Sequence, residues 1–158
     1  MSLMAKSKKE ICALVRCMIR RDLAEVLQIE QESFEFAWSE DDFLRALRQL
    51  NCMGMVAEYD GYVAGFMVLE FHKLQIRVLN LAVTPPCRRY GVGSQMIAHL
   101  ISRLSPPRRN IAMKIRETNL AAQLFLRKNG FRAKKILREQ YYDKSPGEDA
   151  YLMTYSAR

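Results

Sequence analysis

A short basic segment that contains two glycines has the residue types that bind a pyrophosphate. It reads Arg88-Arg89-Tyr90-Gly91-Val92-Gly93 and stands between a predicted strand and a predicted amphipathic helix. The glycines let the backbone approach a ligand closely, and the amides and dipole of a helix start favour an anion. The two arginines add cationic donors. The segment therefore predicts a site for a phosphorylated ligand, although its spacing differs from a dinucleotide fingerprint and from a Walker loop.

The rest of the chain predicts the elements that would position this segment. Apolar-rich or alternating stretches predict strands over 12–19, 52–59, 62–71, 75–83, 111–115, 131–137 and 150–155. Apolar residues at helical spacing predict helices that begin at Asp22, at Ser39, at Gly91 and at Thr118 or Asn119. The order β-α-α-β-β-β-α-β-α-β-β predicts an α+β fold with helices on both faces of a sheet.

Turn and capping residues predict where several of these elements begin and end. Asp60-Gly61 is a two-residue hairpin signal, and Ser39 with Asp42 three residues later forms a capping box. Gly130 stands where a left-handed cap would end the helix that reaches Asn129. Apolar spacing extends the first two helices to Phe34 and Leu50.

Two stretches of the chain resemble the motifs of a known superfamily. Leu79–Pro85, followed by Arg88–Gly93 and the helix, resembles the acetyl-CoA motif of the GNAT acetyltransferases. Asn119–Ala122, Phe125 and Asn129–Phe131 resemble the second motif of that superfamily. Further matches resemble the ribosomal-protein-alanine N-acetyltransferases, the RimI group, and they are Phe36–Glu40, Tyr141-Tyr142 and Gly147–Ala150. The resemblance runs from about Arg20 to Tyr155.

This resemblance implies a fold and a cosubstrate. The fold would be a mixed, mostly antiparallel, seven-stranded sheet with about four helices on its two faces, splayed between the fourth and fifth strands. Acetyl-CoA would be the cosubstrate, with no metal, and the reaction would be direct acetyl transfer to a protein N-terminus. The implied substrate is the N-terminal alanine of a small-subunit ribosomal protein.

The resemblance also assigns site residues. The pantetheine arm would pair with the backbone of the fourth strand, amides of the basic segment would hold the pyrophosphate, and Asn119 would hydrogen-bond the pantetheine. The implied acetyl-CoA-binding residues are Leu81, Ala82, Val83, Arg88, Arg89, Tyr90, Gly91, Val92, Gly93, Ser94, Asn119 and Phe125. Phe36, Trp38, Tyr141 and Tyr142 would flank the incoming peptide, with core packing as the alternative role for Phe36.

The sequence departs from the family at both catalytic positions. The family's general base lies five residues before the motif asparagine, where this chain has Lys114, and its acidic tyrosine lies seven residues after, where this chain has Leu126. An α-amine, with a reference pKa of about 7.7–8.0, is roughly one-tenth neutral at pH 7, so an α-amine acetyltransferase tolerates the loss of a base better than a lysine acetyltransferase. A charged Lys114 facing the site would favour the neutral amine by repulsion. Tyr142 is a candidate acid for the leaving thiolate.

Other classes of function remain open at this point. A non-catalytic acyl-CoA-binding module would keep the basic segment and lose the acid and base, as this chain does. An acetyltransferase for another small amine or another N-terminus would also fit. The net charge of +8 suits an anionic ligand or partner. The aromatic and basic strand pattern of an RNA-recognition sheet is missing, so direct nucleic-acid recognition is not expected.

Length and composition predict one folded domain. The chain has 158 residues, 49% of them hydrophobic, so we expect a basic leader over 1–11 and a single domain over 12–158. No apolar run reaches the ~18 residues of a membrane helix, and no signal-peptide pattern follows the first basic residues, so we expect a cytoplasmic protein without membrane contact. The four cysteines and two histidines are scattered, which predicts reduced thiols and no metal site.

Overall fold

The computed structural model describes residues 9–141 and 147–158, and the described part holds seven strands and four α-helices. In chain order the elements are β1 (Leu14–Cys17), the 3₁₀ turn η1 (Arg20–Asp22), α1 (Leu23–Ser33), α2 (Glu40–Leu47), β2 (Cys52–Tyr59), β3 (Tyr62–Phe71), β4 (Gln75–Val83), the 3₁₀ turn η2 (Pro85–Cys87), α3 (Val92–Ser102), β5 (Asn110–Arg116), α4 (Leu120–Lys128), β6 (Arg132–Tyr141) and β7 (Glu148–Ser156). Tyr142 and most of the predicted 1–11 leader lie outside the described residues.

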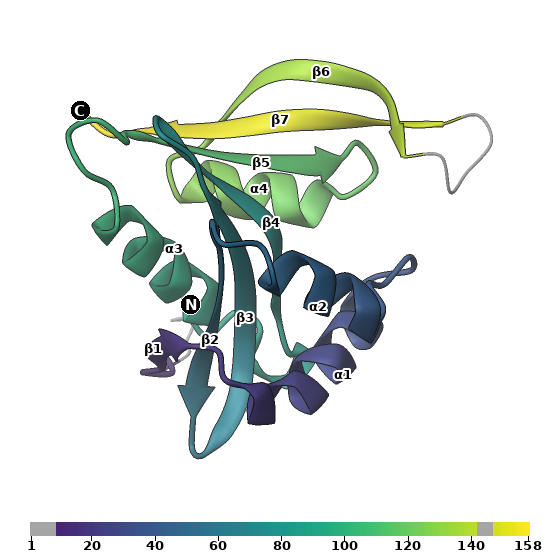
Figure 1. The fold of residues 1–158 in the computed structure, drawn as a ribbon, viewed down its shortest axis with the longest axis vertical. Helices are drawn as coiled ribbons and strands as arrows, with labels where there is room; N and C mark the ends of the chain where they lie inside the picture. The colour runs from purple at the N-terminus through teal and green to yellow at the C-terminus, as the bar shows by residue number, and fades with distance from the viewer. Residues whose placement is uncertain (1–8, 142–146) are drawn as a thin grey trace, which may run out of the picture.

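All seven strands form one sheet in the order β1-β2-β3-β4-β5-β7-β6. Every neighbouring pair is antiparallel except β4 and β5, which are parallel. Helices α1 and α2 pack on one face, and α3 and α4 pack on the other (Figure 1). The predicted mixed, mostly antiparallel, seven-stranded sheet with helices on both faces is confirmed.

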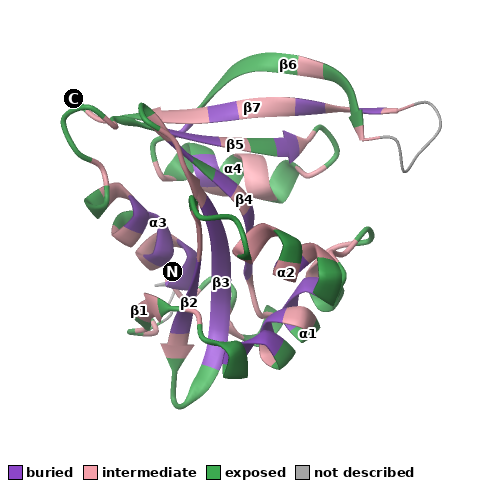
Figure 2. Cartoon of the chain, viewed as in Figure 1, coloured by how far each residue is buried: buried purple, intermediate pink, exposed green. Residues whose placement is uncertain are grey.

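The sheet has a hydrophobic core on each face because the side chains of a central strand alternate between the faces. In β3, Phe66 and Val68 join the core under α1 and α2, and Met67 and Leu69 join the core under α3 and α4. Most of β3 is therefore buried, as its purple colour in Figure 2 shows. These two cores hold β4, the neighbour of β3, in a fixed position.

Strands β4 and β5 separate halfway along their length, which is the predicted splay. Their parallel pairing ends at Val78 and Met113. On its other side β4 stays paired with β3, but the register shifts there because Val68 faces Asn80 while Leu69 faces Val78. Leu79 is thus the extra residue of a β-bulge, a feature that re-aims side chains next to binding sites.

Capping residues mark the start of α2 and the end of α4 where the sequence predicts them. Ser39 Oγ accepts from Asp42 N at 3.2 Å, and Asp42 Oδ2 accepts from Ser39 N at 2.9 Å, so the capping box before α2 is present. After α4, Phe131 N donates to Leu126 O and Gly130 N to Arg127 O, with Gly130 at φ +92°. These two bonds form a Schellman motif, which confirms the predicted left-handed cap.

Several predicted boundaries were wrong. Strand β1 covers only Leu14–Cys17 rather than 12–19, because the chain turns into η1 after Ile19. Phe34 has left α1 with an extended backbone, and Leu50 lies beyond α2 and is fully exposed. Strands β6 and β7 run further than 131–137 and 150–155, and their pairing resumes at Tyr141 and Glu148 after a register shift.

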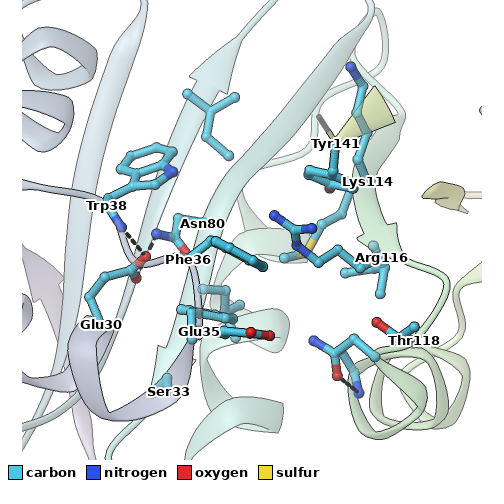
Figure 3. Close-up of a pocket in the computed structure, with 17 residues that line it drawn as sticks. Glu30, Ser33, Glu35, Phe36, Trp38, Asn80, Lys114, Arg116, Thr118 and Tyr141 are labelled. Atoms are coloured by element: carbon cyan, nitrogen blue, oxygen red, sulfur yellow. Dashed lines mark hydrogen bonds between the residues drawn. The ribbon is translucent and has the colours of Figure 1, made fainter. Parts of the chain in front are cut away.

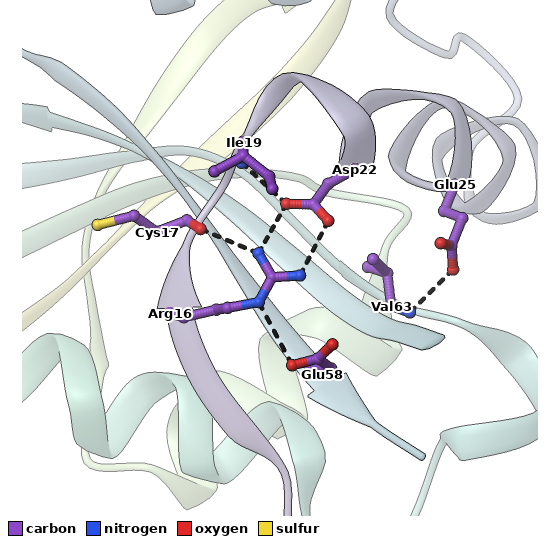
Figure 4. A network of polar contacts seen from close by, with 7 residues as sticks. All are labelled: Arg16, Cys17, Ile19, Asp22, Glu25, Glu58 and Val63. Carbon is purple, nitrogen blue, oxygen red and sulfur yellow. Dashed lines mark hydrogen bonds and ion pairs between the residues drawn. The ribbon is translucent and has the colours of Figure 1, made fainter. Parts of the chain in front are cut away.

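An ionic network explains the turn at η1. Arg16 makes two hydrogen bonds to the buried carboxylate of Asp22, at 2.8 and 2.9 Å, and a longer one to Glu58 at 3.4 Å (Figure 4). Asp22 also accepts from Ile19 N at 2.8 Å. The Arg16 guanidinium is the main reason that the pKa of Asp22 lies below its ordinary value. This network fixes the start of α1, whose other end reaches the candidate site.

Candidate active site

A pocket of about 410 Å³ opens where β4 and β5 separate. It lies between the C-terminal end of α1 with the α1–α2 loop on one side, and β5, the start of α4 and the end of β6 on the other (Figure 3). We call it the β4–β5 pocket, and its lining residues are Glu30, Ser33, Phe34, Glu35, Phe36, Trp38, Leu79, Asn80, Leu81, Met113, Lys114, Ile115, Arg116, Thr118, Asn119, Ala122 and Tyr141.

The edge of β4 that faces β5 presents two peptide units beyond the point of separation. Thr84 N donates to Ala64 O of β3 at 2.8 Å. Because alternate residues of an antiparallel strand turn their peptide groups to opposite edges, Ala82 also faces β3 while Leu81 and Val83 face the open edge. The side chain of Ala82 is buried in the core under α1 and α2. Leu81 and Val83, which the family resemblance assigned to the pantetheine, are therefore the two that can pair with an extended ligand.

The basic segment forms a tight loop between η2 and α3. Arg89 and Gly91 both have left-handed backbones, at φ +67° and +85°, and Gly91 is the residue before the helix. The first bond across the start of α3 runs from Gln95 N to Gly91 O at 3.0 Å, so the amides of Val92, Gly93 and Ser94 precede the intrahelical ladder. A helix start with this geometry can accept an anion.

Close packing, and not backbone conformation, is the reason that position 93 requires a glycine. A Cβ atom at this position would lie 2.9 Å from Cζ of Phe125, whose half-buried ring belongs to α4. Glycine thus lets α3 and α4 approach each other beneath the loop. Phe125, one of the predicted acetyl-CoA-binding residues, packs against the first turn of α3 in this structure.

Arg88 points away from the helix start. Its Nε donates to Val83 O at 2.8 Å, and its Nη2 donates to Ser33 Oγ at 2.9 Å. Arg88 thus ties the end of β4 to the end of α1 and occupies the open-edge carbonyl of Val83. The prediction that its guanidinium faces the phosphates finds no support in this geometry, since the side chain is engaged at the pocket's α1 wall.

Asn119 and its neighbour Thr118 lie at the start of α4. Asn119 is the N-cap, and its Oδ1 accepts from Ala122 N at 3.2 Å while the residue lines the β4–β5 pocket. Thr118 N donates to the buried carboxylate of Glu148 at 3.2 Å. The α4 end of the pocket is therefore anchored to β7.

Arg116 is the largest polar side chain on the β5 wall of the pocket. Its guanidinium carbon lies 3.9 Å from the ring centroid of Tyr141 and 5.0 Å from that of Phe36. Nη1 of Arg116 also lies 3.0 Å from Oε2 of Glu148. Through these contacts Arg116 joins the α1–α2 loop to β6 and β7, so the predicted substrate residues Phe36 and Tyr141 meet at one wall.

Glu30 anchors the opposite wall. It is only 1% exposed, and its two oxygens accept from Trp38 N at 3.0 Å and from Asn80 Nδ2 at 2.8 Å. Burial raises the pKa of Glu30 above its ordinary value. The ring of Trp38, another predicted substrate residue, packs edge-on against Phe43 with centroids 5.1 Å apart. Glu30 thus fastens the α1–α2 loop to the bulge of β4.

The two catalytic positions of the family differ in their surroundings. Leu126, at the position of the family's acidic tyrosine, is 1% exposed and packs in the core under α3 and α4. Lys114, at the position of the family's base, lines the pocket and is exposed. In Figure 3 its side chain extends away from Glu30 and Glu35. Tyr142, the candidate acid, lies outside the described residues.

Six polar residues of the pocket were not predicted from the sequence as site residues: Glu30, Ser33, Glu35, Asn80, Arg116 and Thr118. Asn80 stands inside the quoted motif Leu79–Pro85, and its polar side chain within an apolar strand was the available signal. Arg116 lies two residues after Lys114 on β5, and residues two apart in a strand face the same side of the sheet. Glu30 and Glu35 had no such signal, because an acidic residue in a helix or loop is ordinarily solvated.

Comparison with known proteins shows the family of the chain. Residues 23–131 match the model of the Acetyltransferase (GNAT) family. The [ribosomal protein bS18]-alanine N-acetyltransferase of Escherichia coli K12 is 31% identical over 137 residues, which cover 84% of this chain and 89% of that protein.

Solved structures give the same result. The crystal structure of the E. coli ribosomal-protein-S18-alanine N-acetyltransferase matches with a TM-score of 0.81 and 25% identity, covering 92% of this chain and 94% of the other. Ard1 from Thermoplasma volcanium matches with a TM-score of 0.82 and 26% identity, covering 94% and 99%. The fold, the splayed strands and these matches agree, and the chain belongs to the GNAT acetyltransferase family.

Proposed function

We propose that this chain is an acetyl-CoA-dependent N-alpha-acetyltransferase that acts on a protein N-terminus, with the N-terminal alanine of a small-subunit ribosomal protein as its substrate. The observation that carries the proposal is the β4–β5 pocket, which joins an open strand edge for a pantetheine arm to an aromatic wall for a peptide. The E. coli relative, whose name states this activity, matches over most of both chains.

The proposed acetyl-CoA site uses the backbone more than the side chains. The peptide group of Leu81 and the N–H of Val83, whose carbonyl accepts from Arg88, would pair with the pantetheine. The amides from Arg89 to Ser94 would hold the pyrophosphate. The proposed route between these two groups runs along the open edge of β4 and over the start of α3, which are separated in the chain by η2 and the basic segment. Asn119 lines the pocket at the inner end of this route.

The proposed peptide site lies on the other side of the pocket. Phe36, Tyr141 and Arg116 form one wall, and Trp38 with Glu30 fixes the loop that carries Phe36. Tyr142 stays the candidate acid for the leaving thiolate, and Lys114 would favour the neutral amine from the pocket rim. One unit charge about 7 Å away in a water-like dielectric changes a pKa by roughly half a unit, so the effect of Lys114 would be small.

Mass spectrometry tests the proposal directly. The enzyme is incubated with acetyl-CoA and a peptide that carries an alanine N-terminus and an internal lysine, and fragmentation locates the added acetyl group. Acetylation of the α-nitrogen alone is the expected result. Acetylation of the lysine would contradict the N-alpha assignment, and no acetylation despite acetyl-CoA binding would favour a non-catalytic acyl-CoA-binding module.

No helix of the described residues is long and apolar enough to cross a membrane. A substrate on the ribosome fits the net charge of +8, since a basic surface associates with an anionic particle without reading its sequence. We propose no direct nucleic-acid recognition and no metal for this reaction, because acetyl transfer from a thioester to an amine needs a nucleophile and a carbonyl held together.

A further inference from the structure

The loop that precedes α3 is in contact with a segment from the start of the described chain. Residues 10–13, which we call the anchoring segment, come before β1 and run along the start of α3 (Figure 1). Ile11 N donates to Tyr90 O, in the middle of the basic segment, at 2.9 Å. A Cβ atom at Gly91 would lie 3.4 Å from Cδ of Glu10. The anchoring segment therefore lies directly against the loop.

The side chain of Gln95 fastens the anchoring segment to α3. Its Nε2 donates to Ile11 O and, at 3.1 Å, to Gly91 O, and its Oε1 accepts from Ala13 N at 2.9 Å. Both N–H groups and the oxygen of this amide thus meet backbone groups of the matching kind. Gln95 is half-buried, so water competes with these bonds less than it would at an exposed site.

The loop has a backbone that requires support from its surroundings. Arg89 has φ +67°, a region that residues with a side chain rarely adopt, and Gly91 follows at φ +85°. A strained backbone of this kind persists only where neighbouring structure holds it. Tyr90 stands between these two residues, and its carbonyl accepts from Ile11 N. The anchoring segment is therefore bonded to the strained part of the loop.

The same loop leads into the proposed pyrophosphate site. The amides of Val92, Gly93 and Ser94 precede the intrahelical ladder of α3, so they are the donors that an anion can use. A loop that is already held in its binding conformation loses less conformational entropy when a ligand binds. Loss of the anchoring contacts should therefore weaken the binding of the cosubstrate.

We propose that Gln95 is a positioning residue for acetyl-CoA, which holds the pyrophosphate loop in its binding conformation by fastening the anchoring segment to it. This inference rests on the proposed acetyl-CoA-dependent function. The side chain of Gln95 bonds to the backbone of the protein and lies outside the lining of the β4–β5 pocket. Gln95 therefore affects the affinity for acetyl-CoA and not the transfer of the acetyl group.

The test compares Gln95→Met with Asn51→Leu. Methionine is unbranched like glutamine and favours a helix, but it cannot donate to Ile11 O or Gly91 O. Asn51 is a control of the same chemistry, because its Nδ2 donates to a backbone carbonyl, Phe71 O, at 3.3 Å. Phe71 lies near the start of β4, whereas the loop follows the end of β4.

Titration calorimetry with CoA, which carries the same pyrophosphate as acetyl-CoA, measures the affinity directly. We expect the Kd for CoA to rise about tenfold in Gln95→Met, which corresponds to about 1.4 kcal/mol, and to stay within twofold of the wild type in Asn51→Leu. A wild-type Kd for CoA in Gln95→Met would overturn the proposal.

Steady-state kinetics distinguish positioning from a general loss of structure. In Gln95→Met the KM for acetyl-CoA should rise about tenfold, while kcat at saturating acetyl-CoA and the KM for the peptide should stay within twofold of the wild type. Amide hydrogen exchange over 89–94 should be faster in this variant, with unchanged exchange in α2. An equal rise of both KM values, or faster exchange throughout the protein, would show a merely structural role.

Glu10→Gln distinguishes the charge of the anchoring segment from its bonds. This variant keeps the backbone donor of Ile11 and removes one negative charge beside the loop. We expect its Kd for CoA to be equal to or below that of the wild type, because a carboxylate near the loop repels phosphate groups. A tenfold weaker affinity in Glu10→Gln would show that the segment acts through this carboxylate, and it would contradict the role of Gln95.

These results are distinguishable from a failure of the proposed function, because CoA binding is measured without turnover. If the wild-type protein does not bind CoA, the proposed function is wrong. If the wild type binds CoA and acetylates a free N-terminus, and Gln95→Met binds CoA equally well, the function stands and Gln95 is not a positioning residue.

Discussion

The side chain of Asn80 in β4 donates a hydrogen bond of 2.8 Å to the carboxylate of Glu30 in α1, and both residues are buried. Because the other oxygen of Glu30 accepts from Trp38 N, this contact joins helix, loop and strand at one carboxylate. The bulge at Leu79 precedes Asn80 in β4 at the point where β5 departs. One buried acid therefore places the peptide-binding loop against the splayed strand.

Replacing Glu30 with Gln tests this anchor. Both partners of Glu30 are donors, so the amide nitrogen of a glutamine would face one donor and leave it unsatisfied. We predict a loss of about 1–3 kcal/mol in the free energy of unfolding, together with a raised KM for the peptide. Urea unfolding and steady-state kinetics measure the two effects. Wild-type stability in Glu30→Gln would contradict the role of Glu30 as an anchor.

The contacts of Arg116 predict weaker peptide binding in a variant that keeps the positive charge but loses the planar guanidinium. Lysine in place of Arg116 cannot stack between Phe36 and Tyr141 as a guanidinium does. We expect the KM for the peptide to rise about tenfold in Arg116→Lys, and the KM for acetyl-CoA to stay constant. Arg138→Lys is the matched control, because Arg138 pairs with Asp149 on the exposed edge of β6. An equal KM for the peptide in both variants would contradict a role of Arg116 in peptide binding.

Two glycines with similar backbone angles allow an effect on acetyl-CoA binding to be distinguished from an effect of backbone strain on stability. Gly91 before α3 and Gly61 in the β2–β3 turn have φ +85° and +77°. Alanine in either place costs about 1–2 kcal/mol because its Cβ is strained in the left-handed region. We predict similar losses of stability in both variants, but a raised KM for acetyl-CoA in Gly91→Ala alone. A raised KM in Gly61→Ala would show that the effect comes from destabilisation.

The Asp22 network predicts a pH dependence of stability. Since the pKa of Asp22 is lower in the folded protein than in the unfolded chain, its contribution is present above the ordinary aspartate pKa, about 3.9. That contribution is lost as the pH falls through the folded value. We expect Asp22→Asn to destabilise the protein by about 3 kcal/mol at pH 7 and by less in acid. Glu58→Gln, on the longer and more exposed arm of the network, should cost under about 1 kcal/mol. Equal destabilisation of Asp22→Asn at both pH values would contradict this assignment.

The sequence predicted the elements well where the local signals were strong. Capping residues at Ser39 and Gly130 and the turn at Asp60-Gly61 fixed boundaries by backbone chemistry alone. Strand β6 was cut short at 137 in the prediction, because its second half is polar and is stabilised by pairing with β7 and by Asp149, which accepts from Glu139 N at 2.8 Å. Tertiary partners of this kind leave no periodic pattern in the sequence.

The candidate site was predictable only for the residues that belong to motifs. The loop at Gly91 and the open edge at Leu81 followed from the quoted motifs, and Leu81 lines the β4–β5 pocket. Arg88 was assigned to the phosphates by its charge, yet its bonds to Val83 and Ser33 depend on the packing of α1. Glu35 lines the pocket from a loop that is anchored at Glu30. The bond between Glu30 and Asn80 joins residues 50 positions apart, so no local pattern in the sequence indicates it.

The most direct test of the central claim measures release of the CoA thiol with acetyl-CoA and two peptides. One peptide carries the alanine N-terminus of the small-subunit ribosomal protein, and the other has the same sequence with a blocked N-terminus and an internal lysine. We predict thiol release with the free N-terminus and none above background with the blocked peptide. Equal release with both peptides, or release with the blocked peptide alone, would contradict an α-amine acetyltransferase.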